Sequence, residues 1–333
     1  MTAVQAPLVT GATGFVGGHL ARRLCAQGAR PRLLVRDAAR LAADLRDACD
    51  VHVGDLDDLP ALREAVRGVD TVFHCAGNVN TWGPRATYER ANVTGVRNLL
   101  EAVAQGTRSL RRFVHISTVD VYGFPLQGCD EHCATRAPGF GYGDSKLAGE
   151  QLVRKLGTEQ GLPWVILRPT NIMGPGSPFI RRIGKELRSG LMLTVDGGRC
   201  DAGFLYIDNL VDCLVWAAKD AAAVGEIYNV SDPEPVSWKR FLHDFRQGIA
   251  GKGWLIDLPY PLAQAAARVI AAPYRLLGLR QEPLLHPLIV QIFGRTCGHS
   301  ADKLARAGGP VGRIPYAQAM ATSVAWFLQN SQP

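Results

Sequence analysis

A tyrosine and a lysine four residues apart, Tyr142 and Lys146, are the residues of this sequence best suited to move a proton. The residues that follow them fit a helix, and positions i and i+4 of a helix share one face. A free tyrosine has a pKa of about 10, and a nearby ammonium group stabilises the phenolate and lowers that pKa. The pair could therefore exchange a proton with a substrate oxygen. An isolated Tyr-x-x-x-Lys more often lies on a solvated helical face. The other motifs in the sequence therefore decide whether this pair is part of an active site.

A glycine-rich turn near the N-terminus predicts a dinucleotide site. A short apolar run leads into Thr10-Gly-Ala-Thr-Gly-Phe-Val-Gly17, and a helix-like segment follows. The three glycines let the backbone approach a pyrophosphate, and a helix N-terminus offers free N–H groups and a positive dipole end. The spacing is G-x-x-G-x-x-G and not the commoner G-x-G-x-x-G. The strand, turn and helix context is nevertheless the one that a dinucleotide fingerprint requires.

The residue after the second apolar run bears on the choice of cofactor. An NAD site expects an acidic residue about 20 positions after the glycines, where it binds the ribose hydroxyl. Arg36 stands there, directly after the run 31–35. A guanidinium group suits a 2′-phosphate, so the sequence favours NADP(H) over NAD(H). The neighbouring Asp37 is the argument for NAD(H).

Apolar runs alternate with helix-like segments through the first half of the chain, which predicts βαβ units and a parallel sheet. Ligands bind at the carboxyl ends of such strands. Asp55, Ala76-Gly77 and Ser117-Thr118 all follow apolar runs and are expected at that edge. Asp55 could accept a hydrogen bond from an adenine amine or could cap the next helix. The expected fold class is a doubly wound α/β fold of the Rossmann type.

Composition and charge exclude several other classes. The chain has 333 residues, 47% hydrophobic and 20% charged, which suits a large core in one domain or two. The net charge of +7 is spread out without a Lys/Arg tract, so no nucleic-acid partner is expected. The eight cysteines complete no zinc pattern, which predicts reduced thiols, no metal and a cytoplasmic protein. We recognise no signal peptide and no apolar run of roughly 18 residues that could span a membrane.

These motifs jointly resemble the extended short-chain dehydrogenases/reductases of the NAD-dependent epimerase/dehydratase superfamily. They appear in the family's order over about the first 230 residues. The residues from Trp82 to Asn92 also resemble the 3β-hydroxysteroid dehydrogenase-like and ketoreductase branch. The matching pieces are Thr10-Gly-Ala-Thr-Gly-Phe-Val-Gly17, Gly54-Asp55-Leu56, His74-Cys-Ala-Gly77, Asn92-Val-Thr-Gly95, Ser117-Thr118 with Val121-Tyr-Gly123, Tyr142-x-x-x-Lys146, Arg168-Pro169 and Tyr206-Ile-Asp208.

The resemblance implies a role for each catalytic residue. Tyr142 would be the general acid for carbonyl reduction or the base for alcohol oxidation. Lys146 would bind the nicotinamide ribose and lower the pKa of that tyrosine. Thr118 would orient the substrate oxygen, and Ser117 would contact the nicotinamide side. Asn92 would support a proton-relay water, although a helix cap explains it equally well.

The resemblance also implies an organisation and a cofactor site. A dinucleotide-binding domain is expected over residues 1–173, with parts of 200–235 returning to it. A smaller, mainly α-helical substrate lobe is expected over 174–333, and a homodimer through the helices that begin near Asn92 and Tyr142. The expected cofactor-binding residues are Gly11, Thr13, Gly14, Phe15, Val16, Arg36, Asp55, Leu56, Cys75, Ala76, Gly77, Ser117, Tyr142, Lys146, Pro169 and Ile172.

The C-terminal part is less specific. Helices over 179–187 and 238–247 and a strand over 226–230 are expected from the apolar pattern. Residues 258–294 are rich in apolar side chains interrupted by arginines. This segment could close over a lipophilic substrate, make an oligomer or membrane-surface contact, or be core. The basic residues Arg181, Arg182, Lys185 and Arg199 would suit a sugar-nucleotide diphosphate.

The function that we predict is NADP(H)-dependent hydride transfer between the nicotinamide and a small-molecule ketone or secondary alcohol. The apolar C-terminal part favours a lipophilic substrate that is steroid-like, β-keto acid-like or polyketide-like. A nucleotide-sugar epimerase, dehydratase or reductase is the alternative. A second alternative is a non-catalytic NADP(H)-binding sensor, against which the intact Thr118, Tyr142 and Lys146 argue.

Overall fold

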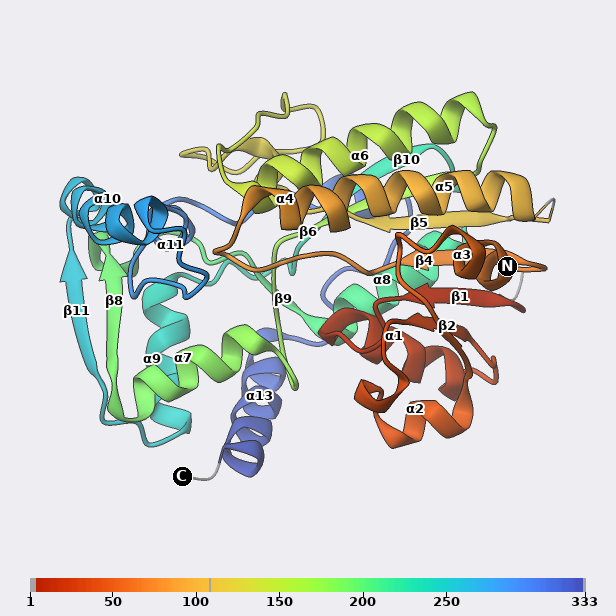
Figure 1. Cartoon of the computed structure of the whole chain (residues 1–333). Coiled ribbons are helices and arrows are strands. Elements are labelled where there is room, and N and C mark those ends of the chain that lie inside the picture. Colours follow the sequence, from red (N-terminus) through yellow and green to blue (C-terminus); the bar gives the residue numbers. More distant parts are fainter. Residues whose placement is uncertain (1–3, 108, 332–333) are drawn as a thin grey trace.

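The computed structural model describes residues 4–107 and 109–331. Within these residues, seven parallel strands form a central sheet in the order β10-β6-β5-β4-β1-β2-β3 (Figure 1). The predicted doubly wound α/β fold is confirmed. The strands are β1 (Pro7–Thr10), β2 (Arg32–Val35), β3 (Asp50–Val53), β4 (Thr71–His74), β5 (Arg112–Ile116), β6 (Trp164–Pro169) and β10 (Glu226–Val230).

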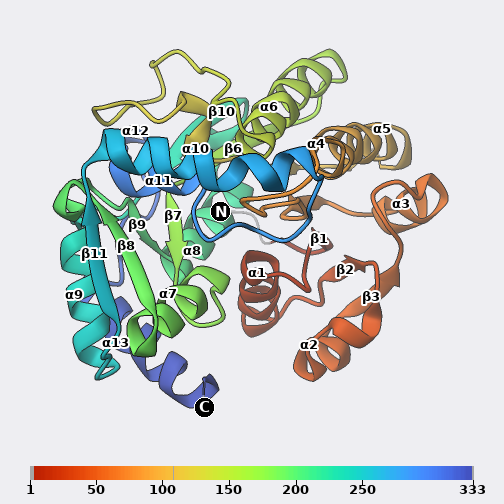
Figure 2. The same cartoon turned by 60° about the vertical axis from the view of Figure 1, so that its left-hand side comes forward.

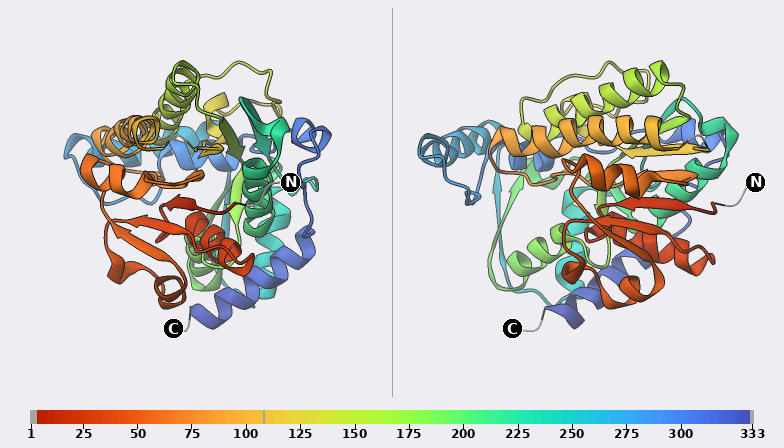
Figure 3. Two further views of the ribbon diagram at one scale, coloured as in Figure 1. Left: turned by 90° about the vertical axis from the view of Figure 1, so that its right-hand side faces the viewer. Right: turned by 45° about the vertical axis from the view of Figure 1, so that its right-hand side comes forward.

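Helices cover both faces of this sheet (Figure 3). On one face lie α3 (Leu59–Val66), α5 (Gly95–Gly106) and α6 (Gly141–Glu159), which pack against one another. On the other face α1 (Phe15–Ala26) packs against α8 (Ile207–Lys219), and α2 (Ala43–Ala48) lies beside α1. Burial on both faces explains why β1, β4 and β5 are fully buried and nearly continuous apolar runs.

The apolar face of α5 is part of this core. Val96, Leu99, Leu100 and Val103 are fully buried in the cluster that also contains α3 and β5 side chains. Core packing therefore accounts for these four residues, and they offer no free surface to a second copy of the chain.

The C-terminal region is mainly helical, as predicted, and carries two small parallel sheets (Figure 2). Its aromatic core is centred on Trp238, whose ring centroid lies 4.2 Å from that of Phe293. The strands are β7 (Asn171–Met173) with β9 (Phe204–Tyr206) and β8 (Leu191–Val195) with β11 (Trp254–Leu258). The helices are α7 (Pro178–Ser189), α9 (Trp238–Gly248), α10 (Tyr260–Leu276), α11 (Pro287–Gly294), α12 (Asp302–Arg306) and α13 (Tyr316–Asn330).

The apolar segment 258–294 has two different environments. Helix α11 is core, with Leu288, Val290 and Phe293 buried. Helix α10 buries small residues such as Ala263 and Ala267 and leaves larger apolar side chains exposed. The core interpretation thus holds for α11 and for only one face of α10.

A buried ion pair lies beneath the carboxyl edge of the sheet. Arg168 of β6 and Glu150 of α6 are 3% and 1% exposed, and Arg168 Nε donates to Glu150 Oε2 at 3.0 Å. Ser117 Oγ, at the end of β5, donates to the same carboxylate at 2.7 Å. Arg168 Nη1 donates to the Tyr122 hydroxyl at 2.8 Å, and that hydroxyl donates to Asn229 of β10 at 2.8 Å. The Arg168 guanidinium on β6 is therefore linked, directly or through one further side chain, to α6, the end of β5, the turn that contains Tyr122, and β10.

Replacing Glu150 by Gln is expected to destabilise the fold by about 3–5 kcal/mol, because it leaves the Arg168 charge buried without its counter-charge. Urea unfolding measures the loss. Glu159→Gln, at the exposed end of the same helix, is the matched control and should change stability by less than about 0.5 kcal/mol. Equal stability of the two variants would show that the pair does not hold this edge together.

Candidate active site

The glycine turn after β1 forms a cradle that only glycine permits. Gly11 has φ +75°, and a Cβ there would lie 2.7 Å from the backbone nitrogen of Ala76. A Cβ at Gly17 would lie 2.4 Å from the carbonyl oxygen of Gly11. Helix α1 then begins at Phe15 without a side-chain cap, so its first N–H groups remain available to an anion. These features fit the pyrophosphate of a dinucleotide, and they bring the predicted 11–16 and 75–77 segments into contact.

The polar residues expected at the adenosine end lie at the ends of β2 and β3. Arg36 is exposed directly after β2, while the Asp37 carboxylate accepts from the backbone of Ala39 at 2.9 Å and caps a short 3₁₀ turn. Asp55, after β3, accepts from the backbone of Leu56 at 2.7 Å and faces Arg90 at 3.8 Å. Asp58, and not Asp55, caps α3 by accepting from Ala61 at 3.0 Å. The cap that sequence reasoning offered for Asp55 is therefore wrong.

Tyr142, Thr118 and Lys146 come together at the carboxyl edge of the sheet. Tyr142 lies on the first turn of α6, near the Thr118 hydroxyl, which acts to lower the pKa of the phenol. Lys146 is buried one turn later, and its Nζ donates to the carbonyl oxygen of Ile116 at the end of β5. The sequence prediction that the tyrosine and lysine share one face of a helix therefore describes their positions on α6 correctly.

The electrostatics of this group differ from the prediction in one respect. Burial raises the pKa of Tyr142 above its usual value, and the neighbouring Asp120 raises it further. The expectation that the tyrosine pKa is lowered is thus wrong for the protein chain by itself. Burial also lowers the pKa of Lys146 to about 8, against the opposing effect of Glu150. A lysine with this pKa is still largely charged at neutral pH and can serve as a donor to a ribose hydroxyl.

Asn92 and Ser117 hold the surrounding backbone. Asn92 is buried in a π-helical turn (Arg90–Thr94), where its side chain bonds both backbone groups of Asn78 and donates to Ser145 Oγ at 2.9 Å. It caps no helix, so that alternative is wrong. The Ser117 hydroxyl is committed to Glu150 and not directed to the nicotinamide side. Pro169 ends β6 and Ile172 lies in β7, both beyond the same sheet edge.

A pocket of about 290 Å³ opens beside the first turn of α6. Its walls come from three separate parts of the chain. One wall contains Trp82 and Tyr88, and another contains Phe140 and Gly141, directly before Tyr142. The opposite wall is the end of α10 and the loop after it, including Tyr274 and Leu279. Aromatic side chains thus contribute to every wall of this pocket.

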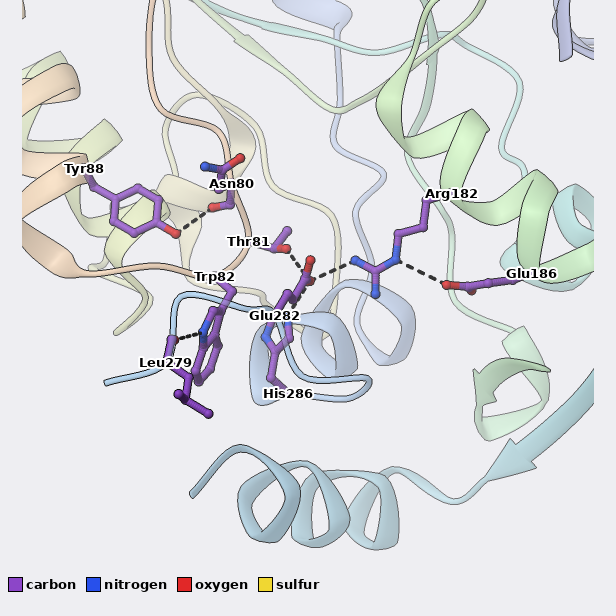
Figure 4. Close-up of polar contacts among 9 residues, drawn as sticks. All are labelled: Asn80, Thr81, Trp82, Tyr88, Arg182, Glu186, Leu279, Glu282 and His286. Carbon is purple, nitrogen blue, oxygen red and sulfur yellow. Dashed lines mark hydrogen bonds and ion pairs between the residues drawn. The ribbon is translucent and has the colours of Figure 1, made fainter. Parts of the chain in front are cut away.

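Glu282 fastens the two sides of this pocket together (Figure 4). Its Oε1 atom accepts from Thr81 at 2.6 Å and from Arg182 at 2.8 Å, and it pairs with His286 at 2.9 Å. Burial alone would raise the pKa of Glu282, but these hydrogen bonds outweigh it and hold the pKa at about 2. The carboxylate is therefore charged at all ordinary pH values. Trp82 Nε1 donates to the carbonyl oxygen of Leu279 at 3.1 Å and adds a second link.

Sequence reasoning missed the role of Asp120 in this site. It follows Thr118 by two residues in a 3₁₀ turn (Val119–Tyr122), and its Cβ packs 3.6 Å from the Cβ position of Gly143 on α6. In residues 4–107 and 109–331 no Lys, Arg or His forms an ion pair with it. Burial raises the pKa of Asp120 to about 7. The signal was an acidic residue in an otherwise apolar stretch, but the sequence gave no sign that Asp120 would be buried.

Residues 4–107 and 109–331 contain no cluster of three or more His, Cys, Asp or Glu side chains that could hold a metal ion.

Asp120→Asn is expected to become more stable than the natural protein as the pH rises. The folded-state pKa of about 7 lies above the ordinary value of 3.8, so the two proteins differ least below pH 4. Between pH 4 and 7 the Asp120 carboxyl ionises in the unfolded chain but stays protonated in the folded one. The free energy of unfolding of the natural protein therefore falls by up to about 4 kcal/mol relative to that of the variant. Thermal unfolding of both proteins from pH 4 to 8 measures the difference. Asp47→Asn, an exposed site on α2, should show no such trend, and a pH-independent difference for Asp120 would contradict its burial as an acid.

Comparison with known proteins agrees with this geometry. The sequence model of the NAD dependent epimerase/dehydratase family matches residues 7–231, which is more than half of the chain. A 4-hydroxy-2-methyl-3-oxo-4-farnesyl-3,4-dihydroquinoline-1-oxide ketoreductase of Stigmatella aurantiaca is 31% identical over 318 residues, 94% of this chain and 93% of that protein. A 2-alkyl-3-oxoalkanoate reductase of Shewanella oneidensis is 29% identical and covers 90% of this chain and 80% of its own length.

A solved structure shares the fold over nearly the whole chain. The UDP-glucuronic acid 4-epimerase of Bacillus cereus, in complex with UDP-glucuronic acid and NAD, superposes with a TM-score of 0.78 at 21% identity. The match covers 98% of this chain and 100% of that one. Other relatives are named as a UDP-glucose 4-epimerase and a 3β-hydroxysteroid dehydrogenase. This chain therefore belongs to the NAD dependent epimerase/dehydratase family, the extended short-chain dehydrogenases/reductases, which are NAD(P)-dependent enzymes that act on CH–OH and C=O groups.

Proposed function

We propose that this chain is a ketoreductase that reduces the carbonyl group of a lipophilic substrate to a secondary alcohol, or oxidises the alcohol in reverse. The observation that carries the proposal is the meeting of Tyr142 with Thr118 beside an aromatic pocket. The bound nicotinamide would supply or accept the hydride. Tyr142 would give the proton to the substrate oxygen, and the Thr118 hydroxyl would hold that oxygen in place.

The pocket supports a lipophilic substrate. Trp82, Phe140, Tyr274 and Leu279 provide apolar and aromatic walls, and Arg275 is the single cation in the lining. The names of the relatives point the same way, since one is a ketoreductase of a farnesylated quinoline oxide and another reduces 2-alkyl-3-oxoalkanoates. Steroid-like, β-keto acid-like and polyketide-like ketones therefore form the substrate class to test first.

The state of the basic residues makes a sugar nucleotide the weaker candidate. Arg182 is held by Glu282 and Glu186, and Arg181 stacks on the Trp326 ring at 5.4 Å. Arg199 donates to the carbonyl oxygen of Asp196 at 2.9 Å. Side chains committed in this way would have to break their contacts before they could bind a diphosphate. The epimerase alternative is retained because of the family's epimerases, and a non-catalytic sensor is disfavoured by the intact catalytic group.

Arg36 supports NADP(H) as the preferred cofactor. It is exposed after β2 and, among the described residues, no carboxylate forms an ion pair with it. The neighbouring Asp37, which would favour NAD(H), already accepts from Ala39. The structural relative was solved with NAD, so the preference needs its own test. The predicted homodimer remains part of the proposal.

The Arg36→Ala variant is expected to bind NADPH roughly tenfold or more weakly and NADH almost as well as the natural protein, because only NADPH offers the 2′-phosphate. Titration of both reduced cofactors by fluorescence measures this split. Arg40→Ala, an exposed arginine on the following turn, controls for a general loss of positive charge. If Arg36→Ala weakens NADH and NADPH equally, or NADH binds the natural protein more tightly, Asp37 becomes the residue that selects the cofactor.

Replacing Tyr142 by Phe is expected to lower turnover by about 100-fold or more while cofactor binding stays nearly unchanged, since only the proton donor is removed. The assay follows NADPH oxidation against a panel of lipophilic ketones and sugar nucleotides. Tyr228→Phe removes the phenol of a β10 residue that donates to the carbonyl oxygen of Ala222, and it should keep full turnover. Substantial turnover by Tyr142→Phe would rule out its role, and conversion of a sugar nucleotide without net NADPH oxidation would favour the epimerase alternative.

A further inference from the structure

Helix α10 presents its larger apolar side chains to solvent and its smaller ones to the protein. Leu262, Val269 and Leu276 are spaced seven residues apart and therefore lie on one side of the helix. Their exposed fractions are 60%, 74% and 87%. The opposite side, with Ala263 and Ala267, is buried against the C-terminal region. A helix that only needed to cover the core would show the reverse arrangement.

More exposed apolar side chains lie on α10 and in the turn that follows the helix. Ile270, Leu277, Leu279 and Leu284 are also exposed, by 38%, 72%, 43% and 71%. We call this surface the α10 face and define it by Leu262, Val269, Ile270, Leu276, Leu277, Leu279 and Leu284. The helix lies at the outer edge of the C-terminal region, away from the central sheet (Figures 1 and 2). Exposed apolar side chains gathered in this number on one helix and its following turn are a mark of interaction sites.

The charged side chains within residues 258–281 are all of one sign. Residues 258–281 contain Arg268, Arg275 and Arg280 and no Asp or Glu. All three arginines are exposed. The two acids that flank this stretch are Asp257, whose carboxylate accepts from Thr194 and from the backbone of Gly197, and Glu282, which is bound by Arg182, His286 and Thr81. An apolar ridge flanked by arginines is the pattern of a helix that lies in the interface of an anionic membrane.

The alternative occupant, a second copy of the same face, is disfavoured by these charges. In a twofold-symmetric dimer the same surface meets itself, so the arginines of one face would oppose those of the other. An anionic lipid surface instead complements them. A membrane-spanning role is excluded for α10, because none of the helices in residues 4–107 and 109–331 is long and apolar enough to cross a bilayer.

We propose that the α10 face docks onto the surface of an anionic lipid bilayer. The apolar ridge would enter the boundary between headgroups and acyl chains, and the arginines would contact the headgroups. The end of α10 also forms one wall of the aromatic pocket through Tyr274, Arg275, Gly278 and Leu279. Docking therefore places the mouth of the pocket next to the membrane. This last consequence rests on the proposed function, because it lets a membrane-dissolved lipophilic ketone reach Tyr142 without crossing water.

Vesicle binding of the full chain tests the docking without any need for turnover. We expect co-sedimentation with vesicles of phosphatidylcholine and phosphatidylglycerol, and roughly 100-fold weaker binding to pure phosphatidylcholine, given three arginines at the surface. Val269→Asp should reduce binding to the anionic vesicles at least tenfold, and Arg268→Gln with Arg280→Gln should reduce the preference for anionic lipid. Val224→Asp is the matched control, because Val224 is 48% exposed but lies at the opposite end of the sheet from the pocket.

The outcomes separate this proposal from the ketoreductase proposal. Vesicle binding that is lost in Val269→Asp but kept in Val224→Asp supports docking even if no ketone is turned over. Docking is overturned if the natural protein does not bind the anionic vesicles, or if Val269→Asp binds them as well as the control does. A different outcome is a natural protein that fails to bind vesicles but self-associates in analytical ultracentrifugation. If Val269→Asp then abolishes that self-association, the α10 face is a contact between two copies of the chain.

Discussion

The buried pair of Arg168 and Glu150 is the interaction on which the geometry of the active-site edge depends. A charge this deep in the protein is tolerable only when it is fully paired, so the partners of both side chains are fixed within narrow limits. Those partners are the end of β5 through Ser117, the following 3₁₀ turn through Tyr122, and β10 through Asn229. Glu150 lies one turn beyond Lys146 on α6, so the same pair also fixes the rotation of the helix that carries Tyr142.

The fold and most of the cofactor cradle follow from local patterns in the sequence. Most strands of the central sheet contain a short apolar run followed by glycine or a polar residue, although β3 alternates polar and apolar residues. The strand expected over 226–230 is β10, and the helices expected over 179–187 and 238–247 are α7 and α9 with slightly different ends. In each of these segments the spacing of apolar residues matched either a helix or a strand. The type of element could therefore be predicted without knowledge of distant contacts.

The remaining features depend on distant contacts and could not be predicted in this way. The i, i+4 spacing placed Tyr142 and Lys146 correctly, but the pKa of the phenol depends on how much water the fold removes, which spacing does not encode. The same is true of Asp120, whose burial results from the approach of α6. In residues 258–294 the composition could not tell which face of α10 is covered, because small alanines fill the core contact and large residues remain outside.

The Glu282 contacts have a consequence for how such enzymes can diverge or be redesigned. The dinucleotide-binding fold and the variable C-terminal region suggest two modules, one for the cofactor and one for the substrate. In this chain the two modules are joined across the pocket. Thr81 and Trp82 on one side donate hydrogen bonds to Glu282 and Leu279 on the other. A C-terminal region transplanted from a relative would meet an unmatched segment at 78–88, which is a loop up to Pro84 and then the start of a short helix. A recombinant with a new substrate specificity therefore has to take residues 78–88 and the C-terminal region from the same parent protein.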